Sequence, residues 1–181
     1  MRTDADLVED LRNGDHRAYS ILYDRYKRAL YLFSLKMLGE PDAASDLVQD
    51  VFLTIYERRS QLKRPESFRS WVFAIARNRC LSQLRRDCGR ASLEEAPAEA
   101  ITVEAPADGL EAEEDVRLIQ QALARLKLEY REVLVLREYH DLSYREIAEI
   151  TETTNSAVKS RLFKARRALH EMLKPAIAGW R

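Results

Sequence analysis

Apolar side chains recur at helical spacing through the first half of the chain. One repeat runs from the candidate helix cap Asp15 to about Leu38, and a second follows the candidate cap Asp42. The second repeat is spaced i, i+1, i+4, i+5, i+8 and i+9, which gives one wide apolar stripe on a helix. Its members are Leu47, Val48, Val51, Phe52, Ile55 and Tyr56. Pro65 then breaks the chain, and a third helix is predicted over residues 67–86, either continuous or in two pieces. The pattern predicts an N-terminal helical bundle.

The second half of the chain shows four shorter helical repeats. Apolar stripes cover residues 118–126 and 133–136, and Ser143 with Glu146 forms an S-x-x-E capping box that begins a third helix. Threonines within residues 151–154 mark a break, because threonine favours caps and turns. The last helix has apolar positions spaced 4, 3, 4 and 3. They are Val158, Leu162, Ala165, Leu169 and Met172. Two short helices joined by a tight turn, the second of them basic, predict a helix-turn-helix.

An acidic segment without periodicity separates the two halves. Residues 91–115 hold nine acidic side chains and no basic one, and their Ala-rich composition cannot build a core. We therefore expect two small helical domains, residues 1–90 and 115–181, joined by a flexible acidic linker over residues 91–114.

Composition supports an all-α fold and excludes several classes of function. Ala (22) and Leu (24) outnumber Ile plus Val (17), which favours helix over sheet. The two cysteines, Cys80 and Cys88, and the three histidines show no metal-ligand spacing, so we expect neither a disulfide scaffold nor a metal or cofactor. No signal peptide or membrane-spanning stretch is visible, and the sequence predicts a reduced, cytoplasmic protein without direct membrane insertion.

The net charge of zero, from 30 basic and 30 acidic residues, hides two basic blocks. Residues 63–90 carry eight basic and two acidic side chains, and residues 157–181 carry seven basic and one acidic. Same-sign runs of this length favour two polyanion-binding surfaces, although solvated helix faces are the alternative.

Both basic blocks contain candidate nucleic-acid contacts. In the first block, the residues that lie outside the apolar core stripe are basic, amide and aromatic. Such residues suit single-stranded DNA, because bases stack on rings while cations follow phosphates. They are Arg69, Phe73, Arg77, Asn78 and Arg79. The alternative places Trp71 and Phe73 in the core.

In the second block, the last helix offers polar residues to base edges, namely Asn155, Ser156, Lys159 and Ser160. Its cations are placed either to meet phosphates or to snorkel along the helix surface, and they are Arg161, Lys164, Arg166 and Arg167. A plain helical hairpin would not need five basic residues between Lys159 and Arg167.

Several segments taken together resemble the extracytoplasmic-function group of bacterial sigma factors. The matching pieces are LRNGDHRAYSILYDRY, DLVQDVFLTIY and SFRSWVFAIARNRCLSQLRR in the first half, and LSYREIAEI and SAVKSRLFKARRAL in the second. The resemblance covers about residues 5–90 and 114–174. It implies a dissociable initiation subunit, with core RNA polymerase and promoter DNA as partners, an anti-sigma factor as an inhibitor, and no enzymatic activity or small-molecule substrate of its own.

The resemblance also implies roles for individual residues. Asp46, Gln49 and Asp50 would contact the polymerase clamp. Asn78 would lie where a loop that captures an unpaired −10 base begins, flanked by backbone contacts from Arg77 and Arg79. The groove-facing −35 set would be Lys159, Ser160, Phe163 and Lys164. The linker would follow the RNA exit path.

The chain departs from the family pattern at the helix-turn-helix turn. Glu152 stands where the family has glycine, and we expect a non-glycine residue there to adopt a positive φ at some cost in stability. Thr154 and Lys127 stand near or at positions where the family has proline.

Two other classes of function remain as alternatives. A stand-alone activator or repressor would bind duplex DNA tightly without polymerase, commonly as a dimer. An enzyme acting on nucleic acid would need an acidic triad, a phosphate-binding Gly loop or a His/Cys pair, none of which the sequence offers.

Overall fold

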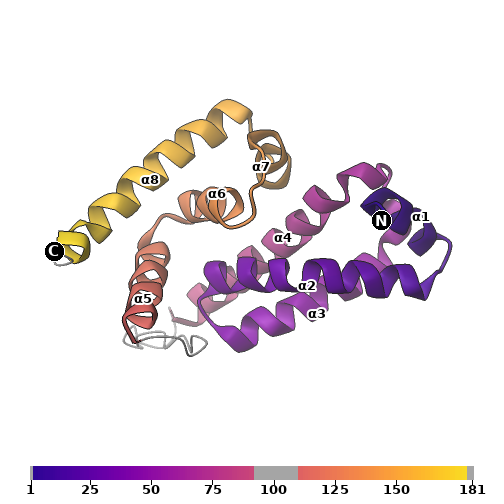
Figure 1. Cartoon of the computed structure of the whole chain (residues 1–181), viewed down its shortest axis with the longest axis horizontal. Helices are drawn as coiled ribbons and strands as arrows, with labels where there is room; N and C mark the ends of the chain where they lie inside the picture. The colour runs from indigo at the N-terminus through magenta and orange to yellow at the C-terminus, as the bar shows by residue number, and fades with distance from the viewer. Residues whose placement is uncertain (1, 92–109, 179–181) are drawn as a thin grey trace.

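The computed structural model describes residues 2–91 and 110–178, and the regular elements within them are all helical. The N-terminal module contains α1 (Asp4–Arg12), α2 (His16–Leu38), α3 (Pro41–Glu57), two 3₁₀ turns (Arg59–Gln61 and Pro65–Ser67) and α4 (Phe68–Ala91). The C-terminal module contains α5 (Leu110–Arg125), α6 (Leu128–Glu138), α7 (Tyr144–Thr151) and α8 (Asn155–Ala178). Figure 1 shows the two groups of helices side by side, and the all-α prediction is confirmed.

Local capping explains where the first helices begin and end. Asp15 caps α2, as predicted, and Gly39 ends it with a left-handed φ of 80°. The predicted cap Asp42 is wrong, because Pro41 occupies the first turn of α3 and Glu40 is the cap. The Glu40 carboxylate accepts hydrogen bonds from the backbone N–H groups of Asp42 (3.1 Å) and Ala43 (2.6 Å).

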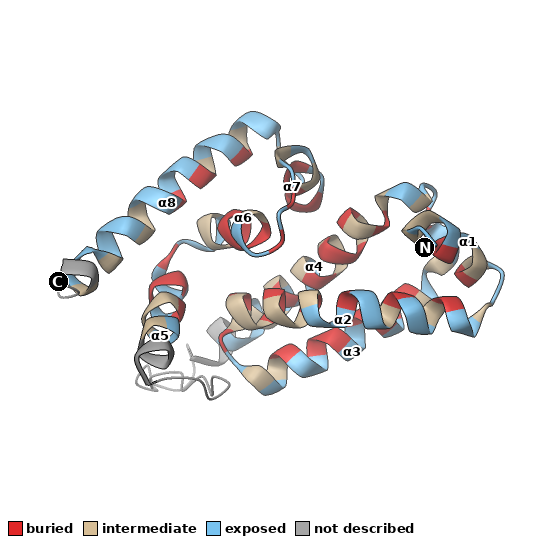
Figure 2. Ribbon diagram, in the orientation of Figure 1, coloured by how far each residue is buried: buried red, intermediate tan, exposed pale blue. Residues whose placement is uncertain are grey.

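The core of the N-terminal module lies between α2, α3 and α4. The predicted stripe on α3 is buried except for half-buried Tyr56. It meets the buried side of α2, where Tyr19 and Tyr23 pack on Phe52. Figure 2 shows these buried faces turned toward one another, with the exposed faces outside. Burying one such side chain contributes roughly 1.5–3 kcal/mol, so this stripe fixes which face of α3 remains accessible.

The predicted capping box begins α7. Ser143 Oγ accepts from the backbone N–H of Glu146 (3.2 Å), and the Glu146 carboxylate accepts from the backbone N–H of Ser143 (2.8 Å). The helix ends at Thr151, where the threonines predicted a break. Glu152 then takes a left-handed conformation with φ 53°, so the expected positive φ at this position is confirmed.

Replacing Glu152 with glycine should stabilise the protein. A left-handed non-glycine residue costs roughly 1–2 kcal/mol, and glycine relieves that strain. The expected gain is about 1 kcal/mol, seen as a rise of about 2–4 °C in melting temperature for a chain of this size. Glu171→Gly is the control, because Glu171 is exposed within α8 and glycine there should lower stability by about 1 kcal/mol. A fall in melting temperature for Glu152→Gly would contradict the backbone strain inferred at this position.

The apolar seam of α8 is buried only in its first half. Val158, Leu162 and Ala165 are buried, Leu169 is half-buried and Met172 is 38% exposed. Figure 1 shows α8 running on beyond α6, which leaves the last turns of the helix less covered. The seam prediction therefore holds for the part of α8 that packs on α6 and α7.

The two modules pack on each other. Contacts join α2 to α5 and α6, and α4 to α7. Arg131 Nη1 donates to the carbonyl of Met37 (2.8 Å), and Gln120 Nε2 donates to the carbonyl of Leu35 (3.2 Å). Two side chains of the C-terminal module therefore cap the end of α2. Helix α5 begins at Leu110, inside the segment expected to be linker, whereas the linker proper lies outside the described residues. Among the described helices, none combines the length and apolar character needed to cross a membrane.

Candidate nucleic-acid interface

The exposed side of α3 carries an acidic and amide face. Asp46, Gln49 and Asp50 are all exposed, opposite the buried stripe, as the sequence predicted. Leu53 continues this face and is 60% exposed. A groove of about 380 Å³ runs between α3 and α4, and Asp46 and Asp50 line it together with Arg79.

Three consecutive residues of α4 point in three directions. Successive helical residues are about 100° apart, so Arg77 and Arg79 lie nearly on opposite sides of the helix. Arg77 turns toward the C-terminal module, where its Nε donates to Glu132 Oε2 at 2.7 Å. Arg79 turns toward α3, where its Nη2 donates to Thr54 Oγ1 at 3.0 Å and its Nη1 lies 3.7 Å from Asp50. The two arginines therefore do not flank one strand of DNA here.

Phe73 does not lie on an open surface. It is 1% exposed and packs edge-on against Phe33, with ring centroids 5.7 Å apart. It also lies 4.9 Å from the ring of His140, which comes from the C-terminal module. The prediction that Phe73 presents a stacking surface to DNA is wrong for this structure, because the two modules enclose the ring between them.

Asn78 is exposed, but no loop begins there. Helix α4 continues to Ala91, because buried Cys80 and half-buried Leu81 and Leu84 extend its apolar side beyond Asn78. The irregular segment lies earlier, at the two 3₁₀ turns that precede α4. The expectation of a base-capturing loop beginning at Asn78 is therefore wrong in its location.

A cavity of about 410 Å³ opens beside those 3₁₀ turns. Lys63, Arg64 and Trp71 line it, and Glu149 of α7 contributes one wall. An aromatic ring with two cations is the combination that binds a nucleobase and its phosphate. Trp71 stood out in the sequence as an aromatic residue of α4, whereas Lys63 and Arg64 were not predicted as site residues. The KRP run before α4 was the available signal, because proline pre-sets the backbone of a turn and two cations directly precede it.

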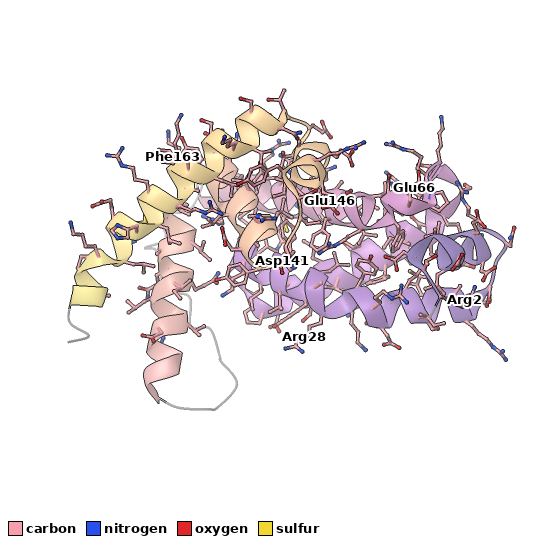
Figure 3. All side chains as sticks on the ribbon, turned by 45° about the horizontal axis from the view of Figure 1, so that its top comes forward. Arg2, Arg28, Glu66, Asp141, Glu146 and Phe163 are labelled. Atoms are coloured by element: carbon pink, nitrogen blue, oxygen red, sulfur yellow. The ribbon has the colours of Figure 1, made fainter. Side chains whose placement is uncertain are left out.

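The N-terminal half of α8 presents the predicted recognition face. Thr154 Oγ1 accepts from the backbone N–H of Ala157 (3.1 Å) and caps the helix. The exposed members of the predicted set are Asn155, Ser156, Lys159, Ser160, Phe163, Lys164, Arg166 and Arg167. Phe163 is 68% exposed, and Figure 3 shows it on the outer side of α8. Side chains of this kind on the first turns of a second helix suit a DNA major groove.

Arg161 departs from the set. Its guanidinium turns toward α6, where Nε lies 3.3 Å from Glu129 and Nη1 lies 3.8 Å from Glu132. Glu132 is buried, so Arg161 supplies a counter-charge that a buried carboxylate requires. The prediction that Arg161 is free for a phosphate is wrong in this structure. Arg166 is likewise paired across to α6, with Nη2 at 2.6 Å from Glu138.

Comparison with known proteins gives two family matches. Residues 22–88 match the model of sigma-70 region 2, and residues 117–169 match the model of sigma-70 region 4. The ECF RNA polymerase sigma factor SigW of Bacillus subtilis is 30% identical over 177 residues, covering 92% of this chain and 95% of SigW. The RNA polymerase sigma-H factor of Pseudomonas aeruginosa is 26% identical, covering 96% of this chain and 95% of that protein.

A solved structure agrees with the fold. The sigma factor RpoE of Bartonella quintana, crystallised with the anti-sigma factor NepR, superposes with a TM-score of 0.75 at 26% identity. The match covers 86% of this chain and 96% of that one. The helix-turn-helix, the acidic face of α3 and these matches over most of the chain lead to one assignment: the chain belongs to the ECF group of sigma-70 factors, which direct promoter-specific initiation of transcription.

Proposed function

We propose that this sigma factor binds core RNA polymerase through the acidic face of α3 and reads two promoter elements with its two modules. The proposal rests on one observation. Both surfaces are exposed to solvent, while the opposite faces of α3 and α8 are buried in the cores of their modules. Asp46, Gln49 and Asp50 on α3 face solvent, and so do Asn155, Ser156, Lys159 and Ser160 on α8. Catalysis then belongs to the polymerase, and the chain acts in the cytoplasm with it.

For the −10 element we propose a path along one side of α4. Trp71 and Asn78 are seven residues apart, so they share a face of the helix about 10 Å apart along its axis. A single strand that places one base in the cavity at Trp71 would pass Asn78 two turns later. Lys63 and Arg64 at the cavity would neutralise its phosphates. This path replaces the base-capturing loop expected at Asn78.

For the −35 element we propose that Lys159 and Ser160 read base edges, with Asn155 and Ser156 at the helix start. Lys164 and Arg167 would meet phosphates, and Phe163 would make apolar contact in the groove. Arg161 is assigned instead to ion pairs with Glu129 and Glu132 of α6.

An anti-sigma factor is proposed as an inhibitory partner. Support comes from the Bartonella quintana sigma factor, which was crystallised with its anti-sigma factor and shares this fold.

Asn78→Ala tests the −10 assignment. The variant should bind core polymerase normally and form several-fold fewer open complexes on a cognate promoter, because one amide contact to an unpaired base is lost. Permanganate footprinting of the opened strand measures this effect. Gln121→Ala is the control, since Gln121 is an exposed amide on α5, away from the proposed path. Open-complex yield equal to that of the unmodified chain would remove Asn78 from the −10 site.

A further inference from the structure

Helix α1 packs against the two 3₁₀ turns that border the proposed base cavity. It contacts both turns and also contacts α4, and Figure 1 shows it beside the first turns of that helix. The apolar side of α1, formed by Leu7, Val8 and Leu11, is almost fully buried. The helix is therefore fixed in place, and it can serve as a support for the turns that it touches.

The last residue of α1 holds the stretch of chain between the two turns. Arg12 Nη2 donates a hydrogen bond to the backbone carbonyl of Leu62. The Leu62 side chain is buried, whereas the next two residues, Lys63 and Arg64, are exposed and line the cavity. A peptide unit is planar, so a bond that fixes the Leu62 carbonyl also fixes the direction in which the chain enters Lys63. The two cations of the cavity thus take their position from a contact to α1.

The backbone between the turns has little support of its own. Gln61 donates to the carbonyl of Arg58, and Ser67 donates to the carbonyl of Arg64, so these bonds close the turns on either side of it. Within the described residues, neither 3₁₀ turn has a side-chain cap. A hydrogen bond from a guanidinium is about twice as strong as one between neutral groups. We therefore expect the position of this stretch to depend on Arg12.

A second path from α1 reaches the aromatic wall of the cavity. The Tyr26 hydroxyl donates to the carboxylate of Asp4, in the first turn of α1. The Tyr26 ring lies edge-on to Phe68, with centroids 5.3 Å apart, and the Phe68 ring lies 6.2 Å from that of Trp71. Edge-on and tilted packing of this kind fixes the orientation of the rings. The two ends of α1 therefore support both the ring and the cations between which a base would lie.

We propose that Arg12 is a positioning residue for the capture of an unpaired −10 base: by holding the backbone carbonyl of Leu62, it places the two cations of the cavity relative to the Trp71 ring. The inference rests on the −10 site proposed at this cavity. Arg12 acts only through the stretch that follows Leu62 and makes no contact with DNA itself. Helix α1 precedes both family matches, which begin at residue 22 and residue 117, so the −10 site extends beyond them.

The test measures binding of the assembled holoenzyme to a fluorescein-labelled fork of a cognate promoter. The fork is duplex through the −35 element, and its −10 element is single-stranded non-template DNA. Each −10 nucleotide in turn is replaced by an abasic residue. With the unmodified chain, one abasic position should weaken binding about tenfold, because that base no longer stacks on Trp71. Trp71→Ala should remove the dependence on this position.

Arg12→Met keeps the length of the side chain and removes its hydrogen-bond donors. It should reduce the ratio of intact to abasic affinity from about tenfold to about twofold, because a site with a loose support no longer closes on the base. Arg12→Lys should restore most of the ratio, since an ammonium can donate to the same carbonyl. Affinity for core polymerase should be unchanged in both variants. Only folded chains assemble with polymerase, so the ratio does not depend on how much of a variant folds.

Arg28→Ala is the matched control, because Arg28 is an exposed arginine of α2 in the same module. Figure 3 shows it on the opposite side of the module from Glu66, which belongs to the second 3₁₀ turn. This variant should keep the full tenfold ratio.

Two results separate the possible failures. A full ratio in Arg12→Met, or the same loss in Arg12→Lys as in Arg12→Met, would overturn the positioning role and leave the −10 site in place. A chain whose unmodified form shows no sensitive −10 position, or whose Trp71→Ala variant keeps one, would overturn the −10 site at this cavity, and the role of Arg12 with it.

Discussion

Replacing Asp46 and Asp50 together with lysine should abolish productive binding to core polymerase. Both carboxylates are exposed on one face of α3, and neither supports the core. Two charge reversals inside one contact surface turn attraction into repulsion, so we expect at least a hundredfold loss of affinity, or about 2.7 kcal/mol. Competition for core polymerase against a labelled copy of the unmodified chain measures the loss.

The control for this variant is Asp24→Lys, an exposed carboxylate on α2 that pairs only locally with Lys27 at 2.6 Å. It should bind polymerase normally. The double variant should keep the helical circular-dichroism signal and melting temperature of the unmodified chain within about 2 °C, since surface substitutions have small effects on stability. Normal polymerase binding by the double variant would place the contact elsewhere.

Lys159→Ala should reduce use of the −35 element about ten- to a hundredfold, with the loss concentrated at one base position. Lys159 is exposed one turn into α8, where side chains of a recognition helix reach base edges. Transcription from promoters carrying every −35 variant measures both the size of the loss and its dependence on sequence. The alanine variant should become tolerant at the position that the lysine reads.

Arg166→Ala is the control for Lys159, because Arg166 is a cation on the same helix whose guanidinium pairs with Glu138 of α6. It should preserve the −35 sequence preference. If Lys159→Ala weakens all −35 sequences equally, the lysine is a phosphate contact, and base reading belongs to its neighbours.

Periodicity predicted most helices because burial of one face dominates their energetics. The stripe on α3 and the Ser143–Glu146 box are local features, and both appear in the structure as expected. Helix α1 was not predicted, although Thr3 and Asp6 form a capping box and Leu7, Val8 and Leu11 bury its apolar side. Nine residues give too short a repeat to stand out without that capping signal.

The candidate site was predictable only where it depends on one helix. The exposed residues of α3 and α8 follow from the positions of their buried faces. Phe73, Arg77 and Arg161 could not be placed, because their partners are distant in sequence: His140 lies in the turn after α6, and Glu132 lies on α6. A helical pattern says which side of α4 is polar, but it does not say that α6 and α7 cover that side.

The measurement that tests the central claim most directly is transcription by purified core polymerase, with and without this chain, from a randomised promoter library. The account predicts initiation that depends on the chain, from promoters sharing one motif near −35 and a second near −10 at fixed spacing. Tight binding of the free chain to duplex DNA, with no dependence of initiation on it, would contradict the account.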